Sequence, residues 1–251
     1  MVKYRWERRK SSDASSFFRI DGKLGFVHCN RTSYEIHMPR ELTQEDVQDF
    51  RARVGEAAAA LYTKGGEGAV TMREIARALG SSPMGLYRYF RDRDEIIAYL
   101  RTAAFNKFAQ SLETAFATGG DPFARARAVG RAYLDFALEN PGDYRLMFDL
   151  SQPDEHGNDE LAKASARATR TVTRHVDDLR GAGIVSGDSK EIGRALWAAA
   201  HGVIVLHLAG RLPKDTDVRA LYFETMRLTF RGARTLSSKI ESLANSKRSL
   251  T

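Results

Sequence analysis

Arginines, tyrosines and hydroxyl side chains are concentrated in residues 71–90, at a spacing that suits contact with a nucleic acid. Arginine can form paired hydrogen bonds with a guanine edge, and tyrosine, serine and threonine hydroxyls can bind phosphate oxygens. The apolar residues of the segment recur at helical intervals, so the polar side chains would share the outward face of two short helices. The pattern therefore predicts a surface that contacts double-stranded DNA.

The apolar side of this segment predicts how the two helices are held together. Ile75 and Leu79 are one turn apart on the first helix, and Leu86 and Phe90 are one turn apart on the second. Gly80, between them, can adopt the left-handed conformation that ends a helix at low cost. This arrangement leaves the N-terminal end of the second helix exposed, and in a helix-turn-helix that end enters the major groove.

The segment resembles the helix-turn-helix of the TetR family of transcriptional regulators, and the resemblance covers residues 43–97. Gly85 departs from the family pattern, in which a threonine is frequent at this site and would offer one more hydroxyl. The resemblance implies a homodimer that binds a palindromic operator, usually as a repressor released by a small ligand. The residues that carry it are Thr71, Ile75-Ala76, Gly80, Leu86-Tyr87-Arg88-Tyr89-Phe90 and Arg91-Asp92-Arg93-Asp94-Glu95-Ile96.

Nine residues are candidate DNA contacts, from the resemblance and from their chemistry. Thr71 would cap the first helix and meet a phosphate, and Arg93 would bind the DNA backbone from the start of the next helix. Arg73 would reach a base edge or a phosphate, and a paired arginine–guanine contact contributes about 1–3 kcal/mol of discrimination. Glu74 and Arg77 are expected on a solvated face. The full set is Thr71, Arg73, Ser82, Pro83, Met84, Tyr87, Arg88, Tyr89 and Arg93.

Helical periodicity from Thr43 onward predicts an all-α fold, in which a small N-terminal three-helix unit is followed by a larger helical bundle. The resemblance implies that the first is a helix-turn-helix domain and that the bundle binds ligand and dimerises. The expected domains are a basic, flexible extension (1–40), the helix-turn-helix domain (41–95) and the bundle (96–251). The helices expected after the first, which starts at Thr43, span about 71–79, 83–90, 92–117, 122–140, 142–150, 157–182, 188–210 and 216–240.

The first 40 residues differ from the rest of the chain, with nine Lys or Arg, four Asp or Glu and no sustained helical period. Residues 17–27 could form a short hairpin, and a flexible tail is the other interpretation. Met38 is a plausible alternative start. The net charge of +7 is not concentrated in the predicted DNA-binding domain, because residues 41–95 hold eight basic and ten acidic side chains. The prediction of DNA binding therefore depends on where the arginines are placed.

The residues of the expected bundle also indicate a dimer interface and a ligand site. Small residues between Ala195 and Gly202 would let helices approach closely in an isologous four-helix interface. Residues 141–148 and Trp197…His201-Gly202 are similar to a C-terminal domain type of the family named for its Trp-His-Gly signature. The ligand would be small and mostly apolar. Its candidate contacts, which also fit an ordinary core, are Phe108, Tyr133, Phe136, Met147, Trp197 and His201.

Other functional classes find little support in the sequence. An enzyme would need a nucleophile–base set, a metal cluster or a phosphate-binding loop, and we expect no catalytic residue, cofactor or metal. His201 and His207 are about 120° from eclipse on a helix, so they cannot share one metal. An architectural DNA-binding protein without an effector is the alternative function, and it would have no cavity in its bundle.

The sequence also bears on where the protein acts. The longest apolar stretch, residues 195–210, is shorter than the roughly 18 residues of a membrane span, and the N-terminus has no signal-peptide core. Cys29 is the only cysteine, so no intrachain disulfide can form. We therefore expect a cytoplasmic protein that does not bind membranes.

Overall fold

The structure is a computed structural model, and its N-terminal strands are described by their backbone only. Side chains are described as far as residue 233 of the last helix. The described residues are 15–20, 23–30, 33–37, 43–118, 120–148 and 158–248.

Three antiparallel strands form a sheet in the order β1-β2-β3. The strands are β1 (Ser15–Ile20), β2 (Lys23–Asn30) and β3 (Ser33–His37). The pairing of Phe17 with Phe26 lies within the hairpin considered over residues 17–27. Asp-Gly, which two-residue hairpin connections favour, separates β1 from β2 in the sequence. The strands differ from the flexible extension expected for residues 1–40, and β3 was not expected.

From Thr43 onward the described residues form helices, which confirms the all-α prediction for this part of the chain. Thr43 and Asp46 cap the first helix reciprocally, with each side chain accepting the other's backbone N–H at 3.1 and 2.9 Å. The elements of the helix-turn-helix unit are α1 (Gln44–Gly65), the 3-10 turn η1 (Glu67–Ala69), α2 (Met72–Ala78) and α3 (Pro83–Leu86).

The bundle follows, and its helix bounds lie within a few residues of those predicted, except at the end of the last helix. None of the helices in the described part of the chain combines the length and apolar character needed to span a membrane. The helices are α4 (Arg93–Thr118), α5 (Pro122–Glu139), α6 (Pro141–Phe148), α7 (Asp159–Gly181), α8 (Ser189–Leu208) and α9 (Val218–Arg248).

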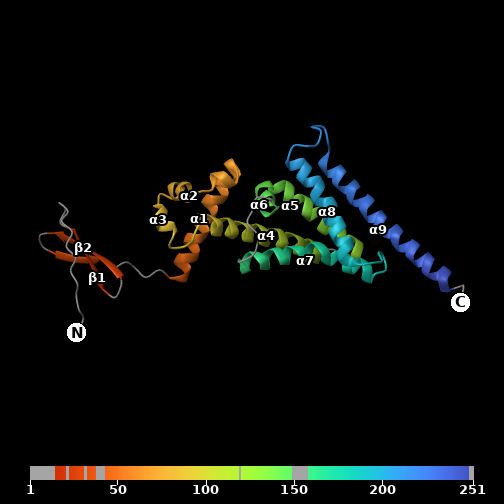
Figure 1. Ribbon diagram of the computed structural model, residues 1–251, viewed down its shortest axis with the longest axis horizontal. Coiled ribbons are helices and arrows are strands. Elements are labelled where there is room, and N and C mark those ends of the chain that lie inside the picture. The colour runs from red at the N-terminus through yellow and green to blue at the C-terminus, as the bar shows by residue number, and fades with distance from the viewer. Residues whose placement is uncertain are drawn as a thin grey trace. The chain divides into compact units, whose positions relative to one another are not determined.

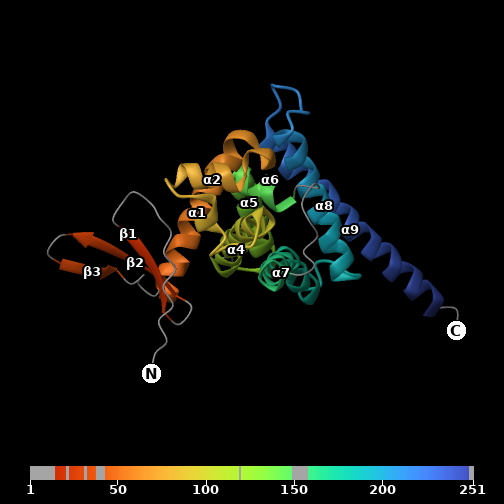
Figure 2. The same cartoon turned by 60° about the vertical axis from the view of Figure 1, so that its left-hand side comes forward.

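Helix α4 links the helix-turn-helix unit to the bundle (Figure 1). Its first turns bury Ile96 and Ile97, while Phe108 and Leu112 are buried in the main core. The view in Figure 2 looks roughly along α4 and shows α5, α6 and α7 around it. Helices α8 and α9 lie side by side in both views and close the far side of the bundle. One continuous helix therefore carries side chains of both functional parts.

Candidate nucleic-acid interface and ligand cavity

The N-terminus of α2 is fixed by Thr71, whose hydroxyl oxygen accepts the backbone N–H of Glu74 at 3.2 Å. The predicted cap is therefore confirmed. Thr71 is half-buried, and a phosphate contact by its hydroxyl stays a prediction. Glu74 also pairs with Arg77 at 2.7 Å on the exposed side of the helix. This pair fits the solvated face expected for both residues.

The turn between α2 and α3 depends on Gly80, which has a φ of +62°, a conformation that L side chains rarely adopt. Ser82 then caps α3 by accepting the N–H of Gly85 at 3.2 Å, and Pro83 occupies the first turn. A Cβ added at Gly85 would lie 3.0 Å from the Ser81 hydroxyl oxygen, so the threonine frequent in the family would require this serine side chain to move slightly.

Helix α3 is shorter than the helix predicted over 83–90. It ends at Leu86, although the N–H of Phe90 still donates to the Leu86 carbonyl at 3.0 Å, so the backbone makes one further turn. Ile75, Leu86 and Phe90 are all buried, as the apolar spacing predicted, and α2 packs against α3. The short α3 and the turn after it are thus positioned by a small apolar core.

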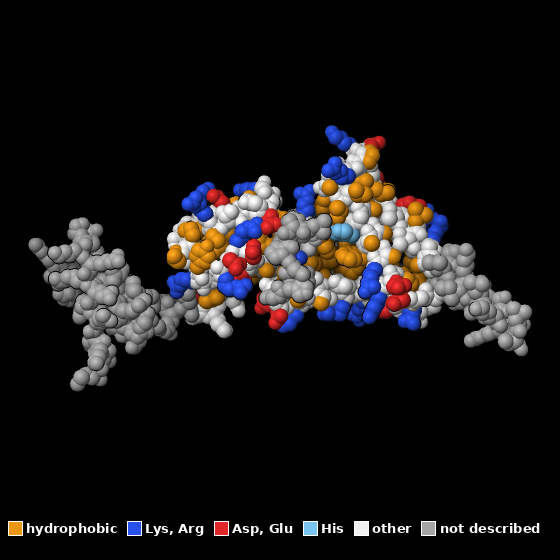
Figure 3. All heavy atoms as spheres, in the orientation of Figure 1, with side chains coloured by type: hydrophobic (Ala, Val, Ile, Leu, Met, Phe, Trp, Pro, Cys, Tyr) orange, Lys and Arg blue, Asp and Glu red, His pale blue; other side chains and the backbone are white. Residues whose placement is uncertain are grey.

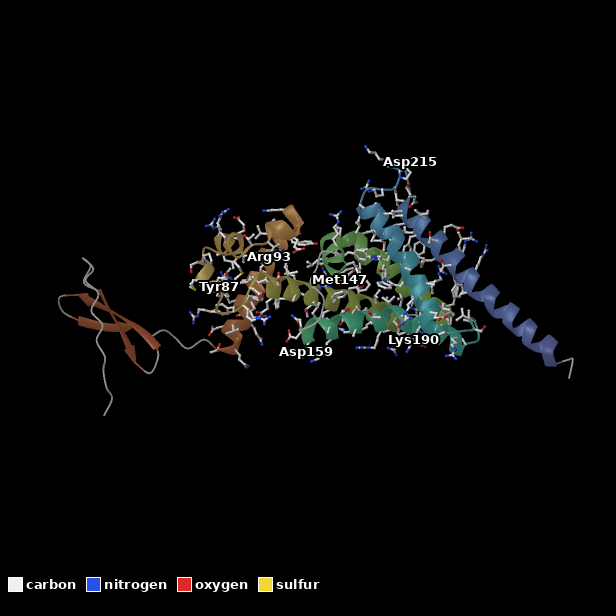
Figure 4. All side chains as sticks on the ribbon, in the orientation of Figure 1. Tyr87, Arg93, Met147, Asp159, Lys190 and Asp215 are labelled. Atoms are coloured by element: carbon white, nitrogen blue, oxygen red, sulfur yellow. The ribbon has the colours of Figure 1, made fainter. Side chains whose placement is uncertain are left out.

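Four of the predicted DNA contacts project outward from this core. Met84 is 76% exposed and Tyr87 is 51% exposed, and Arg73 and Arg88 are exposed as well. Neither arginine forms an ion pair or hydrogen bond with the residues whose side chains are described. Tyr87 lies at the outer end of the helix-turn-helix unit in Figure 4. Among the remaining candidates, Ser82 and Pro83 are exposed, and Tyr89 is half-buried.

Arg93 is placed differently from the other candidates, because its guanidinium binds the protein itself. Its Nε donates to the Val70 carbonyl at 2.7 Å, and Nη2 donates to the backbone carbonyl and the carboxylate of Glu67 at 2.9 and 2.7 Å. The start of α4 is therefore tied to the turn that precedes α2. This geometry favours a positioning role over the direct phosphate contact that we expected.

A cavity of about 420 Å³ lies among α5, α7, α8 and α9. Two of the six predicted ligand residues, Tyr133 and Trp197, line it. Phe108, Phe136 and Met147 are buried in the main core instead, and His201 does not line this cavity either. Wall residues that the sequence analysis did not identify include Phe123, Arg127, Arg131, His175, Tyr222 and Phe230.

A chain of hydrogen bonds connects the cavity wall to His201. Trp197 Nε1 donates to the Tyr133 hydroxyl at 3.1 Å, and the Tyr133 and Tyr144 hydroxyls are 2.9 Å apart. The Tyr144 hydroxyl lies 2.7 Å from Nδ1 of His201. Burial raises the pKa of both phenols, so they stay protonated and available as donors. Burial lowers the pKa of His201, which favours its neutral form.

Two family models match the chain, at positions that correspond to these two parts. The model described as "Bacterial regulatory proteins, tetR family" matches residues 56–100, which include α2 and α3. The model described as "Tetracyclin repressor-like, C-terminal domain" matches residues 126–229, which include most of the bundle. The two models together match more than half of the chain.

Curated relatives are similar to the chain in sequence, and solved structures are similar to it in fold. HTH-type transcriptional regulators of Mycobacterium tuberculosis and Mycobacterium bovis are 28% identical over 143 residues, which cover 56% of this chain and 60% of theirs. A Rhodococcus sp. RHA1 protein of unknown function shares the fold with a TM-score of 0.65 at 24% identity, covering 73% of this chain and 95% of that one. The TetR family transcriptional regulator PfmR from Thermus thermophilus does so with a TM-score of 0.56 at 21% identity, covering 71% and 97%.

Proposed function

Since the chain belongs to the TetR family of transcriptional regulators, we propose that it binds a palindromic operator as a homodimer and that a small ligand in its bundle releases it. DNA binding is supported by one observation above all. Four side chains on the capped helix-turn-helix point outward: Arg73, Met84, Tyr87 and Arg88. Because operator DNA is cytoplasmic in bacteria, the protein would act in the cytoplasm.

The exposed side chains suit both kinds of contact that specific DNA binding requires. Arg73 and Arg88 have no competing acidic partner among the described side chains, so binding DNA would break no ion pair. Met84 and Pro83 offer apolar surface for thymine methyl groups, and the Tyr87 hydroxyl can donate to a phosphate. Base contacts from the N-terminal end of α3 would determine the sequence bound, while phosphate contacts would fix its position.

The homodimer is supported by the outer face of α8 and α9. Val205 and Leu206 on α8 and Leu228 on α9 are between 41% and 56% exposed, which is unusual for large apolar side chains. A Cβ at Gly202 would meet no atom within 4 Å, so this side of α8 is open to a second helix. Hydrophobic side chains are visible on the surface of the bundle in Figure 3. An isologous pairing of this face would bury them.

Helix α4 and Arg93 offer a route from ligand to DNA. Helices α5 and α7 line the cavity and pack against α4, so a ligand that shifts either of them would move α4 as well. Arg93 would transmit that movement to the turn before α2. Two binding domains must match half-sites about 34–36 Å apart, so a small tilt would break contacts. Such coupling is typically about 1–3 kcal/mol and is reciprocal, so operator DNA would weaken ligand binding by the same factor.

The alternative is an architectural DNA-binding protein with no effector. The cavity among α5, α7, α8 and α9 favours the ligand-responsive function, because an architectural protein has no need of such a space. The resemblance of Trp197…His201-Gly202 to the Trp-His-Gly domain type stays a prediction. An enzyme is not proposed, since the matched family and the curated relatives are transcriptional regulators.

Selection of bound DNA from a random pool tests the proposal directly. A palindromic consensus with two half-sites one helical turn apart, or a multiple of it, would support a specific dimeric regulator. A pool that keeps no consensus after several rounds, despite measurable DNA binding, would favour the architectural alternative. Absence of DNA binding at low salt would contradict both functions.

A further inference from the structure

The cavity among α5, α7, α8 and α9 has an apolar interior. Val129 and Tyr133 of α5, Leu179 of α7, Ala200 of α8 and Tyr222 of α9 are all buried and line it. Its volume of about 420 Å³ lies near the lower end of the roughly 300–1,000 Å³ typical of small-molecule sites. The interior therefore suits the apolar body of a small ligand.

The hydroxyl groups of this interior are already engaged. The Tyr133 hydroxyl accepts from Trp197 and bonds to Tyr144, and the Tyr222 hydroxyl donates to the Gly130 carbonyl at 2.9 Å. His175 also lines the cavity, and burial lowers its pKa to about 4 although Asp178 and Asp177 oppose the shift. The imidazole is therefore neutral at pH 7, and the interior presents no charge to a ligand.

The outer part of the wall is strongly basic. Arg127 and Arg131 of α5 and Arg227 of α9 are exposed where they line the cavity, and none of the wall residues in the described part of the chain is acidic. Arg227 pairs with Glu224 on its own helix. Arg127 and Arg131 lie one turn apart and form no ion pair or hydrogen bond with the side chains that the structure describes. Two guanidinium groups are thus available beside the opening of an apolar cavity.

We propose that this cavity binds an amphipathic anion, with the apolar body between α5, α7, α8 and α9 and the anionic head at Arg127 and Arg131. The proposal deepens the proposed function, on which it rests, by naming the chemical class of the effector. Arginine is charged at all relevant pH values and binds carboxylate or phosphate oxygens through paired hydrogen bonds. A cationic ligand of the same size would be repelled by the same groups.

Calorimetric titration of the full-length protein with three probes of equal chain length tests the charge preference. The probes are decanoate, decanol and decylammonium, and no DNA is present. We expect decanoate to bind most tightly, decanol more weakly and decylammonium most weakly. Equal affinity for decanoate and decanol would overturn the role of the arginines, and binding of none of the three would overturn the proposal.

A double variant, Arg127→Ala with Arg131→Ala, separates the head-group contact from apolar burial. It should weaken decanoate binding on the order of 10-fold and leave decanol unchanged, since each exposed ion pair contributes modestly. The matched control is Arg180→Ala with Arg194→Ala, which removes two exposed arginines of α7 and α8 that do not line the cavity. An equal loss in both double variants would indicate net charge alone and would contradict a specific site.

A second pair of variants tests whether decanoate binds in this cavity. Gly130 lies within α5, and a Cβ there would have only the Tyr222 hydroxyl within 4 Å, at 3.9 Å, so Gly130→Leu should fold and fill the cavity. Replacing a mid-helix glycine also raises helix propensity by up to about 1 kcal/mol. Gly130→Ala is the control that keeps the space. Loss of decanoate binding in Gly130→Leu, but not in Gly130→Ala, supports the site, and unchanged binding in both contradicts it.

The two proposals can fail separately in these experiments. Selection of a palindromic DNA combined with no binding of decanoate would overturn the ligand class and leave the regulator intact. Decanoate binding that Gly130→Leu abolishes, combined with no DNA binding, would support the cavity and overturn the regulatory function.

Discussion

The Tyr144 hydroxyl lies 2.7 Å from Nδ1 of His201, and this contact fixes the direction of a buried chain of hydrogen bonds. The indole N–H of Trp197 can only donate, so the Tyr133 oxygen accepts from it. Every O–H of the chain then has an acceptor only if Tyr133 donates to Tyr144. Tyr144 must then donate to His201, which requires an unprotonated Nδ1. Protonation of His201 would leave one O–H of the chain without an acceptor.

Stability should therefore fall as the pH drops below about 6.5, the ordinary pKa of histidine in the unfolded chain. Burial lowers the pKa of His201, and it lowers that of His175 to about 4, so the unfolded state binds protons that the folded state does not. For His175, this stabilising contribution is complete above pH 6.5 and is lost toward pH 4, by up to about 1.4 kcal/mol per pH unit. His201, whose pKa burial also lowers, contributes in the same direction. Urea unfolding between pH 7.5 and 5 measures the slope.

Substitution of His175 tests the origin of this pH dependence. His175→Leu should reduce the slope, because it removes a neutral histidine whose buried Nδ1 has no hydrogen-bond partner among the described residues. A slope in the wild type that does not differ from zero over this range would contradict the neutral state of both histidines.

The fold could be predicted closely from the sequence because local signals define its helices. Thr43, Thr71, Ser82 and Asp121 all accept a backbone N–H at a helix start, and Gly80 has the positive φ that its position suggested. The end of α3 was less predictable, since apolar spacing continues to Phe90 whether the backbone bonds are helical or those of a turn. The N-terminal strands were ambiguous because their aromatic residues alternate only in part.

The ligand cavity was harder to predict than the DNA-binding surface. An aromatic residue such as Phe108 or Tyr133 has the same helical spacing whether it packs in a core or lines a space, so only the assembled bundle separates the two. The spacing of Arg127 and Arg131 next to Gly130 was a usable signal. A glycine in mid-helix leaves room, and arginines one turn apart mark one face.

Arg93→Ala should destabilise the helix-turn-helix unit by about 2 kcal/mol, since it removes charge-assisted hydrogen bonds to Glu67 and a bond to the Val70 carbonyl. Arg93→Lys should recover only part of this loss, because an ammonium cannot reproduce the planar fork. Thermal unfolding measures both. Arg91→Ala is the control. The Arg91 side chain is largely exposed, and its ion pair with Glu95 is longer, at 3.5 Å, so we expect a smaller loss.

The salt dependence of operator binding separates this role from a direct phosphate contact by Arg93. A positioning residue leaves the slope of log affinity against log salt nearly unchanged when it is removed. A phosphate contact would reduce the slope by about one. Unaltered stability together with a reduced slope would restore the role first expected for Arg93.

Tyr87→Ala and Arg88→Ala should each weaken operator binding without unfolding the protein. Both side chains are exposed, so the buried Leu86 and Phe90 keep their packing. Loss of an arginine that contacts a guanine should cost about 1–3 kcal/mol and relax the preference at that base pair. Fluorescence anisotropy with the selected operator measures the change. Arg77→Ala removes the same charge from a residue paired with Glu74, and we expect little effect from it.

Leu206→Asp should convert the proposed homodimer into monomers. Leu206 on α8 is 46% exposed, and a carboxylate placed in an isologous interface meets its own symmetry copy, so each dimer would bury two unpaired charges. Leu228→Asp on α9 should act in the same way. Ala162→Asp, at an exposed position of α7 outside this face, is the control. Light scattering at micromolar concentration should give a dimer for the wild type and the control. A wild-type monomer would contradict the dimer, and an unchanged dimer in both α8 and α9 variants would move the interface elsewhere.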